Sequence, residues 1–358
     1  MALDLILLPH CAASPQQMEE LIFAASGGSV AEIESMLQHP HNPDAANNHS
    51  ATALMAASRS GKLEVVRLLL EAKAQTDLTN DSGSTALLLA SRQGHIEVAR
   101  LLLEAAAQTD LADKHGVTAL MVAPIDEVRL LLEAKAQTDL AKYDGWTALI
   151  LASEQGRVEV VRLLLEAGAQ VNLPKVDGWT ALMAAAQFGC VEVVRTLLAA
   201  TAQVNLATIL GVTALMAACR PGHVGVVRLL LEAGAHTDLT DKRGFTALIL
   251  ASGRSFDGKI TRLRVEVVRL LLGAAAETNL TAKDGSTALM AASRDDHTEV
   301  VRLLLEACAR MDSPDISGDA ALMQASQRGQ AQAACLLSGS SASDGSDVAA
   351  SSSNESTP

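Results

Sequence analysis

The sequence contains very few aromatic residues: two Trp, one Tyr and four Phe in 358 residues. Aromatic rings supply much of the buried area of ordinary globular cores, so this chain must build its core from aliphatic side chains. Cysteine is also scarce, and the five thiols have neither paired nor metal-like spacing. They are Cys11, Cys190, Cys219, Cys308 and Cys335. This pattern excludes a disulfide framework and is typical of reduced thiols inside a cell.

Positive charge is in the minority, since 28 Lys and Arg face 41 Asp and Glu and leave a net charge of -13. This balance argues against the phosphate contacts on which nucleic-acid binders depend, and against anionic lipid. No apolar run approaches the roughly 20 residues of a membrane span. The opening stretch, residues 1–15, lacks a positively charged start, carries Asp4 and is short for a signal peptide. We therefore expect no membrane insertion and a cytoplasmic location by default, with the nucleus also open.

A repeated triplet, Thr-Ala-Leu, organises the chain. Successive copies are 33 residues apart, except for one interval of 29 and one of 41 residues. The copies begin at Thr52, Thr85, Thr118, Thr147, Thr180, Thr213, Thr246 and Thr287, with a variant at Ala320. A fixed period of this length indicates a stack of small units, none of which can bury its apolar face alone.

One complete unit spans residues 146–178. Thr147 is suited to cap a short helix from Ala148 to Gln155, which Gly156 ends. A second apolar stripe predicts a helix over residues 158–167. The pair Asp177-Gly178 is suited to the tight reversal of a hairpin-like finger. Helices of two or three turns are marginal alone in water, so the units must stabilise one another by stacking.

The repeat resembles the ankyrin repeat in its period and in second helices such as GHIEVARLLLEAAA, which begins at Gly94. The match covers roughly residues 20–337, although Ala replaces the Pro of the family signature T-P-L-H-x-A in every copy. The resemblance implies an all-α repeat solenoid of helix-turn-helix units with projecting β-hairpin-like fingers. We expect a loose leader over residues 1–13, about ten units over 14–337 with degenerate units at both ends, and a disordered Ser-rich tail over 338–358.

Two units depart from the period. The third is four residues short and carries Pro124 where its first helix should finish. This is either a tolerated deletion or a hinge. The seventh has eight extra residues in a basic stretch, Gly253 to Arg264, which is either a surface insertion or a docking loop for an acidic segment.

The position after the second helix is usually Gly in the family, and Gly168 and Gly234 keep it. Elsewhere the residue is Lys73, Ala106, Lys135, Thr201, Ala275 or Cys308. If the resemblance holds, these residues adopt left-handed backbone, which strains any residue with a Cβ and β-branched Thr201 most.

No catalytic pattern is present: the sequence has no phosphate-binding glycine loop, no HExxH, no nucleophile elbow and no kinase motif set. An Arg recurs on the second helices, in most copies with an acidic residue three positions before it and another four positions after it, as Glu159 and Glu166 flank Arg162. This pattern predicts a solvated charged face. Cys190 and His223 occupy equivalent places in adjacent units, but a separation of about 10 Å is far beyond the zinc–ligand distances of about 2.0–2.3 Å. We predict no enzyme activity, no cofactor and no metal.

Six of the seven aromatic residues lie between Tyr143 and Phe256, and Trp146 and Trp179 occupy the same place in consecutive units. In ankyrin-like stacks the fingers and the first helices form a concave surface, so these rings either anchor a partner or pack against the next finger. The expected protein-binding residues are Lys142, Tyr143, Trp146, Glu154, Gln155, Lys175, Trp179, Gln187, Phe188, Lys242, Arg243 and Phe245.

The sequence thus predicts a monomeric, non-catalytic module or scaffold that binds other proteins on its concave face. Two alternatives are a regulatory subunit that inhibits an enzyme by covering it, and an adaptor for a degradation complex. The fold analogy alone does not separate them.

Overall fold

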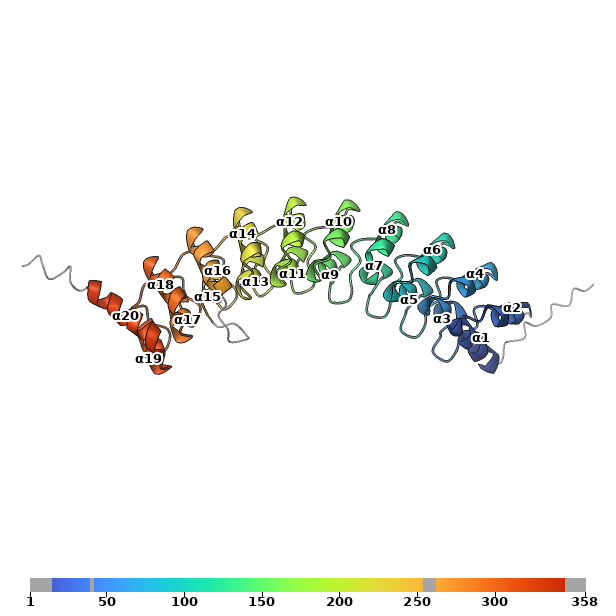
Figure 1. Cartoon of the computed structure of the whole chain (residues 1–358), viewed down its shortest axis with the longest axis horizontal. Coiled ribbons are helices and arrows are strands. Elements are labelled where there is room, and N and C mark those ends of the chain that lie inside the picture. Colours follow the sequence, from blue (N-terminus) through green and yellow to red (C-terminus); the bar gives the residue numbers. More distant parts are fainter. Residues whose placement is uncertain (1–14, 39–41, 254–261, 345–358) are drawn as a thin grey trace, which may run out of the picture. The chain divides into compact units, whose positions relative to one another are not determined.

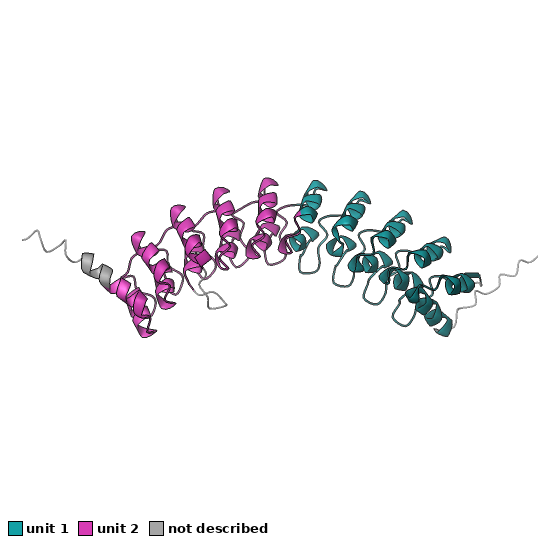
Figure 2. Cartoon of the chain, in the orientation of Figure 1, with its two compact units in different colours: residues 1–152, 159–170 teal, residues 153–158, 171–358 magenta. Residues whose placement is uncertain are grey.

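The computed structural model describes residues 15–38, 42–253 and 262–344. Its contacts divide the chain into two compact units (Figure 2). The first unit comprises residues 1–152 and 159–170, and the second comprises residues 153–158 and 171–358. Within the described residues, twenty helices follow one another in ten pairs (Figure 1).

In the first unit the helices are short and alternate between first and second members of each pair. They are α1 (Pro15–Gly27), α2 (Val30–Gln38), α3 (Ala53–Arg59), α4 (Leu63–Glu71), α5 (Ala86–Gln93), α6 (Ile96–Glu104), α7 (Ala119–Val122) and α8 (Ile125–Glu133). The next pair, α9 (Ala148–Glu154) and α10 (Val158–Glu166), has residues in both units.

The second unit repeats the same alternation. Its helices are α11 (Ala181–Gln187), α12 (Val191–Ala199), α13 (Ala214–Cys219), α14 (Val224–Glu232), α15 (Ala247–Ser252), α16 (Arg262–Gly273), α17 (Ala288–Arg294), α18 (Thr298–Glu306), α19 (Ala321–Gln327) and α20 (Ala331–Asp344). Within each unit, first helices pack on first helices and second helices on second helices: α3 contacts α1 and α5, and α14 contacts α12 and α16. The predicted all-α repeat solenoid is confirmed.

The threonine of each Thr-Ala-Leu triplet caps a first helix. Thr52 has extended backbone, and its Oγ1 accepts a hydrogen bond from the amide of Met55 at 3.3 Å. Thr147 accepts one from Ile150 at 3.3 Å in the same way. The small Ala lets neighbouring helices approach, and Leu54 beside it is 1% exposed. A cap of this kind stabilises a helix by about 1 kcal/mol, which matters for helices of seven residues.

Each repeat ends in a finger closed by backbone hydrogen bonds. The amide of Lys175 donates to the Trp179 carbonyl at 2.9 Å, and the amide of Gly178 donates to the Lys175 carbonyl at 2.9 Å. Fingers within a unit are also joined tip to tip, because the amide of Ile209 donates to the Asp177 carbonyl at 2.9 Å and the amide of Lys242 to the Leu210 carbonyl at 2.8 Å. The predicted hairpin-like fingers are therefore present, and they form a continuous edge in the second unit.

A second ladder of hydrogen bonds joins the repeats after their second helices. Asp77 accepts both the backbone amide of Gln108 at 2.9 Å and its side-chain amide at 3.0 Å. The same bidentate contact joins Asp44 to Gln75, Asp110 to Gln137 and Asp139 to Gln170. In the second unit Asn172 and Asn205 accept the backbone amide of Gln203 and of His236 in the next repeat, each at 2.8 Å. The recurrent Gln-Thr-Asp of the sequence thus fixes the register in which each repeat stacks on the one before it, because the Gln of one repeat donates to the Asp of the preceding repeat.

The four-residue deletion in the third repeat shortens its first helix. α7 has four residues, Thr118 does not cap it through its side chain, and Ala123 ends it with extended backbone. Pro124 then stands at the N-terminus of α8, also in extended backbone. Since proline disfavours helical backbone in the residue before it, α7 cannot continue into this turn.

The left-handed positions expected after the second helices are confirmed. Lys73, Ala106, Lys135, Thr201, Ala275 and Cys308 have φ angles of 64°, 62°, 66°, 62°, 59° and 59°. A residue with a Cβ in this region pays a steric penalty of roughly 1–2 kcal/mol. In these repeats the surrounding packing therefore keeps the residue after the second helix in a strained, left-handed conformation.

We expect Thr201→Gly to stabilise the second unit by about 1 kcal/mol, because it removes the strain of a β-branched residue in left-handed backbone. The melting temperature, followed by circular dichroism, should rise by about 2–4 °C. Thr201→Ala, which keeps a Cβ but loses the branch, should lie between glycine and wild type. A melting temperature for Thr201→Gly at or below that of wild type would contradict the interpretation.

The ends of the described array lie close to the expected boundaries. α1 begins at Pro15, and the leader over residues 1–13 lies outside the described residues. α20 continues to Asp344, so the expected boundary at residue 337 falls inside a helix, and no proline interrupts residues 338–344. Residues 345–358 of the Ser-rich tail lie outside the described residues.

Candidate protein-binding surface

The twelve residues expected to bind a partner all have accessible side chains, since none of them is buried. Their positions are of two kinds, finger residues and residues at the ends of first helices. Lys142, Tyr143 and Trp146 belong to the first unit. The remaining nine belong to the second unit, where Glu154 and Gln155 lie at the end of α9.

In the first unit Lys142 and Trp146 form a pair at the base of one finger. The Lys142 amide donates to the Trp146 carbonyl at 3.0 Å, and its ammonium group lies 5.7 Å from the centre of the Trp146 ring. A cation at this distance over an indole contributes about 0.5–1 kcal/mol at an exposed site. Tyr143 stands at the tip of this finger with 79% of its surface exposed, so it contributes little to packing and is free to contact a partner.

In the second unit Lys175 does not present the free charge that its sequence position suggests. Its Nζ lies 2.8 Å from Asp177 of the same finger, and only 17% of its side chain is exposed. The exposed residue at this tip is Val176, with 74% of its surface accessible. Lys175 therefore shapes its finger, while Val176, absent from the twelve, faces solvent.

A cleft of about 510 Å³ opens within the second unit between the fingers and the first helices. Four of the twelve expected residues line it, namely Trp179, Gln187, Lys242 and Arg243. The other lining residues are Thr208, Leu210, Val212, Met216, Ala217, Arg220, Asp241 and Leu250. The cleft is of the size that proteins use to hold a few side chains of a ligand, and its wall is mainly apolar.

The charge at this cleft is predominantly positive. Asp241 is 7% exposed, accepts the backbone amides of Arg243 and Phe245 at 2.9 Å each, and pairs with the Arg243 guanidinium at 3.2 Å. Arg243 also lies 4.7 Å over the ring of Phe245. Burial lowers the pKa of Arg220, the positive charge of Arg243 lowers it further, and the negative charge of Asp241 acts in the opposite direction. One carboxylate, already held by its own finger, thus faces Arg220, Lys242 and Arg243.

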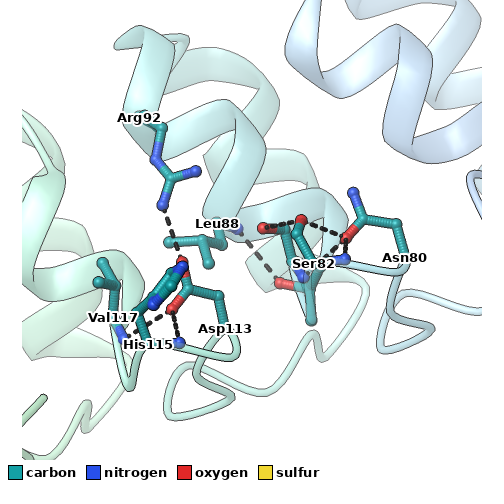
Figure 3. A network of polar contacts seen from close by, with 9 residues as sticks. Asn80, Ser82, Leu88, Arg92, Asp113, His115 and Val117 are labelled. Atoms are coloured by element: carbon teal, nitrogen blue, oxygen red, sulfur yellow. Dashed lines mark hydrogen bonds and ion pairs between the residues drawn. The ribbon is translucent and has the colours of Figure 1, made fainter. Parts of the chain in front are cut away.

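In the first unit, an arginine and an aspartate at the equivalent repeat positions, Arg92 and Asp113, form an ion pair (Figure 3). Arg92 lies in the last turn of α5, at the repeat position that Arg220 occupies directly after α13, and it donates to Asp113 of the next finger at 3.1 Å. Burial raises the pKa of Asp113, but hydrogen bonds from the amides of Val117 and His115 and the contact with Arg92 outweigh it and hold the pKa below its usual value. In the second unit the equivalent carboxylate, Asp241, pairs with Arg243, and its charge also acts on Arg220.

Arg220 and Leu210 are functional candidates that the sequence argument missed. Arg220 occupies the helix-end position of Glu154 and Gln187, so the repeat alignment was sufficient to find it. Leu210 and Ile209 are each 60% exposed at the next fingertip. The sequence feature that could have identified them is an apolar residue at a fingertip position where another finger carries a polar one, as Ser82 does at the position of Leu210.

Some of the expected residues are not brought to the cleft. Phe188 is 56% exposed after α11 and does not line it, and neither do Glu154 and Gln155. Trp146 belongs to the first unit, where its ring lies beside Lys142 of the same finger. The twelve residues are therefore spread over several local surfaces.

The comparison with protein families agrees with the observed repeat. Residues 124–208, 201–263 and 260–350 match a family model described as ankyrin repeats in three copies, and residues 54–103 match one described as ankyrin repeats in many copies. The chain belongs to the ankyrin-repeat family. Ankyrin repeats are generally protein–protein interaction modules and are typically non-catalytic. A search of curated proteins finds no match.

The sulfur and imidazole groups weighed as metal ligands are used in ankyrin stacking. His223 Nε2 lies 3.1 Å from the Gln187 carbonyl, and Cys190 Sγ lies 3.9 Å from the Glu154 carbonyl, each at the end of the preceding first helix. In the described ranges no three His, Cys, Asp or Glu side chains are grouped so that they could hold a metal ion.

The described ankyrin helices include none that is both long and apolar enough to cross a membrane. Their second helices carry the expected charged face, where Arg67 pairs with Glu64 at 3.5 Å and Arg162 with Glu159 at 3.1 Å. Exposed pairs of this kind add only about 0.3–0.5 kcal/mol each.

The end of the basic stretch of the seventh repeat is helical. Residues 254–261 lie outside the described residues, but α16 already begins at Arg262. Arg264, expected in the loop, is 1% exposed in this helix and donates to the Leu250 carbonyl. It therefore packs the start of α16 against α15 and adds no charge to the surface.

Proposed function

We propose that this ankyrin array binds a partner protein through the fingers and adjacent first-helix ends of its second unit. The supporting observation is a run of apolar fingertip residues that the fold leaves in water: Val176, Ile209 and Leu210 are 60–74% exposed in successive fingers. Clustered exposed apolar side chains on a soluble domain mark interaction surfaces. The aromatic Trp179 and the basic residues beside them match the residue types that anchor interfaces.

This surface acts without chemistry of its own, as a module or scaffold that holds its partner. Inhibition of a bound enzyme and recruitment of a degradation complex use the same contact and differ in what the partner is. The activity of a captured partner enzyme, measured with and without this chain, separates inhibition from simple tethering.

The test is quantitative capture from a cell lysate with the full chain and an Ile209→Ser/Leu210→Ser variant. We expect the captured partners to fall by about tenfold or more, because truncating central interface residues typically costs more than about 1–2 kcal/mol each. Ile316→Ser is the matched control, since Ile316 is also an exposed fingertip residue, at 79%, but does not line the cleft. If every partner binds the double variant as well as wild type, this surface is not the interface.

A further inference from the structure

The last helix pair that the structure describes, α19 and α20 of the second unit, leaves open the face on which earlier pairs stack (Figure 1). On α19, Leu322 is 39% exposed and Met323 is 49% exposed. One repeat earlier, on α17, the equivalent Leu289 and Met290 are 0% and 1% exposed, and α19 packs on α17. In the described residues no further helix pair follows α20. The side chains that earlier repeats bury between first helices are therefore open to water on α19.

The outer face of α1, at the other end of the described array, carries a polar residue instead. Glu20 occupies on α1 the position that Ala53 and Ala321 hold on α3 and α19. Ala321 is 1% exposed although no described helix pair follows α19, so this position packs toward the preceding pair. Glu20 is exposed and accepts a hydrogen bond from the side-chain amide of Gln16 at 3.1 Å. The two ends of the described array therefore differ, with a carboxylate on α1 and apolar side chains on α19.

This difference decides which surface can cover α19. Residues 345–358, which follow α20 in the chain, contain one large apolar residue, Val348, and so offer little to match a leucine and a methionine. A second copy stacked head to tail would place its Glu20 against Leu322 and Met323, and burying a carboxylate without a partner is costly. The apolar surface that matches α19 is α19 of a second copy.

We propose that two copies of this chain associate through α19, with Leu322 and Met323 of each copy packed on the same residues of the other about a two-fold axis. The contact continues the stacking interface of the repeats, because a first helix again covers a first helix, as α19 covers α17. An interface that pairs a surface with itself closes at two copies and builds no filament. The protein is then a dimer, in contrast to the monomer that the sequence predicts.

The charges at the two ends of α19 favour an antiparallel pairing of the helices. Asp319 precedes α19 and Arg328 follows it, at nearly equal distances from the middle of the helix, which lies beside Met323. A two-fold axis through this point places Asp319 of one copy near Arg328 of the other, and the pair occurs twice. The side-chain amide of Gln327 lies 3.2 Å from the Asp319 carboxylate, but it is neutral, so the negative charge remains available to the second copy.

Sedimentation equilibrium of the full chain tests the association. We expect a reversible dimer with a dissociation constant on the order of 10 μM, as for a small interface. Leu322→Gln/Met323→Gln should weaken it by about thirtyfold or more, because each apolar side chain is lost from both copies. Circular dichroism verifies that this variant is folded. Phe23→Ser is the matched control: Phe23 is 79% exposed on α1, and its loss should change the dissociation constant less than about twofold.

A charge exchange tests the antiparallel pairing with variants that leave the apolar face intact. Arg328→Glu should weaken the dimer by about threefold at low salt, because two attractive pairs become repulsive, and the effect should shrink as salt is added. Adding Asp319→Lys should restore the dissociation constant to within about twofold of wild type, since each pair forms again with its signs reversed. A role of Arg328 within its own chain would not be rescued in this way.

Cross-linking gives a readout that does not depend on the strength of the dimer. Cys308 and Cys335 are exposed thiols, so the background carries Cys11→Ser, Cys308→Ser and Cys335→Ser. Met323→Cys then places a thiol beside the two-fold axis, where two copies can reach the Cβ–Cβ separation of about 4 Å that a disulfide needs. We expect mild oxidation to link Met323→Cys into a covalent dimer and to leave Phe23→Cys monomeric.

The outcomes also separate this inference from the proposed function, on which it does not rest. A full chain that stays monomeric and does not cross-link through Met323→Cys would overturn it. So would a dimer that survives Leu322→Gln/Met323→Gln, a dimer that Phe23→Ser dissociates, or assemblies that grow beyond two copies. The Ile209→Ser/Leu210→Ser variant should remain dimeric, and loss of the dimer there would assign self-association to the fingers instead of α19.

Discussion

Glu127→Gln is expected to stabilise the first unit by about 3 kcal/mol at about pH 8 and to have little effect at about pH 4.5. Glu127 is 0% exposed in α8. Burial raises its pKa from 4.5 to about 7, and the hydrogen bond with Ser91 offsets only part of this effect. Among the described residues its second oxygen has no hydrogen-bond partner. The fold therefore tolerates this carboxyl as a neutral group better than as an anion.

The geometry around Ser91 fits a protonated carboxyl. Ser91 has one hydroxyl proton, and its Oγ contacts both the Leu87 carbonyl, at 2.9 Å, and Oε1 of Glu127. A protonated Glu127 can donate to Ser91 while Ser91 donates to Leu87, so both contacts are satisfied. An ionised Glu127 competes with Leu87 for the single serine proton.

The sign of the pH dependence follows from the raised pKa. Below about pH 4.5 both the folded and the unfolded chain hold the proton, so the group is neutral in both. As the pH rises from about 4.5 to about 7, the unfolded chain has lost this proton while the folded chain still holds it. Over that range the free energy of unfolding falls by about 1.4 kcal/mol per pH unit. Above that range the destabilisation is complete. Glutamine removes the titration and should flatten this part of the profile.

The measurement is unfolding of the full chain in a Trp179→Phe background, where Trp146 reports on the first unit. Asp126→Asn is the matched control, because it removes the neighbouring carboxylate of α8, which is exposed. If Glu127→Gln and Asp126→Asn change the stability equally at both pH values, Glu127 is not a buried proton-binding group.

The repeat made most of the fold predictable, because each feature occurs many times. The triplet at Thr52 and its copies set the helix starts, and replacements such as Thr201 were correctly placed in left-handed backbone. Glu127 shows where such reasoning stops short. It occupies the core position of Val65, Val98 and Val160. The sequence analysis considered only Pro124 in this shortened repeat and did not predict that Glu127 is buried.

The candidate surface was harder to predict, because side-chain environment does not repeat with the sequence. Lys175 and Lys242 occupy neighbouring turn positions, but one is held by Asp177 and the other is exposed at the cleft. Arg264 was assigned to a loop from composition, whereas burial against α15 places it in a helix. These differences depend on neighbours in the adjacent repeat, which the period alone does not specify.

The fingers of the second unit should tolerate a methyl group at one glycine and reject it at another. Gly178 and Gly318 have similar φ angles, 90° and 81°. A Cβ at Gly178 would lie 2.8 Å from Cα of Thr208 and 3.0 Å from the amide nitrogen of Ile209, whereas one at Gly318 would have no heavy atom within 4 Å. The two sites therefore share the cost of left-handed backbone and differ in the collision with the next finger.

We expect Gly318→Ala to cost about 1 kcal/mol, from backbone strain alone. Gly178→Ala adds overpacking of about 1–3 kcal/mol, because the obstructing atoms are backbone and cannot rotate away, and it should cost about 3 kcal/mol in total. Denaturant unfolding in a Trp146→Phe background, with Trp179 as the reporter, measures both. The same change should weaken partner binding, since displacing Thr208 breaks the hydrogen bond from Ile209 to Asp177 that holds successive fingertips together. Equal losses for the two variants would show that the fingers can separate without cost, and that the cleft they line is not a fixed structure.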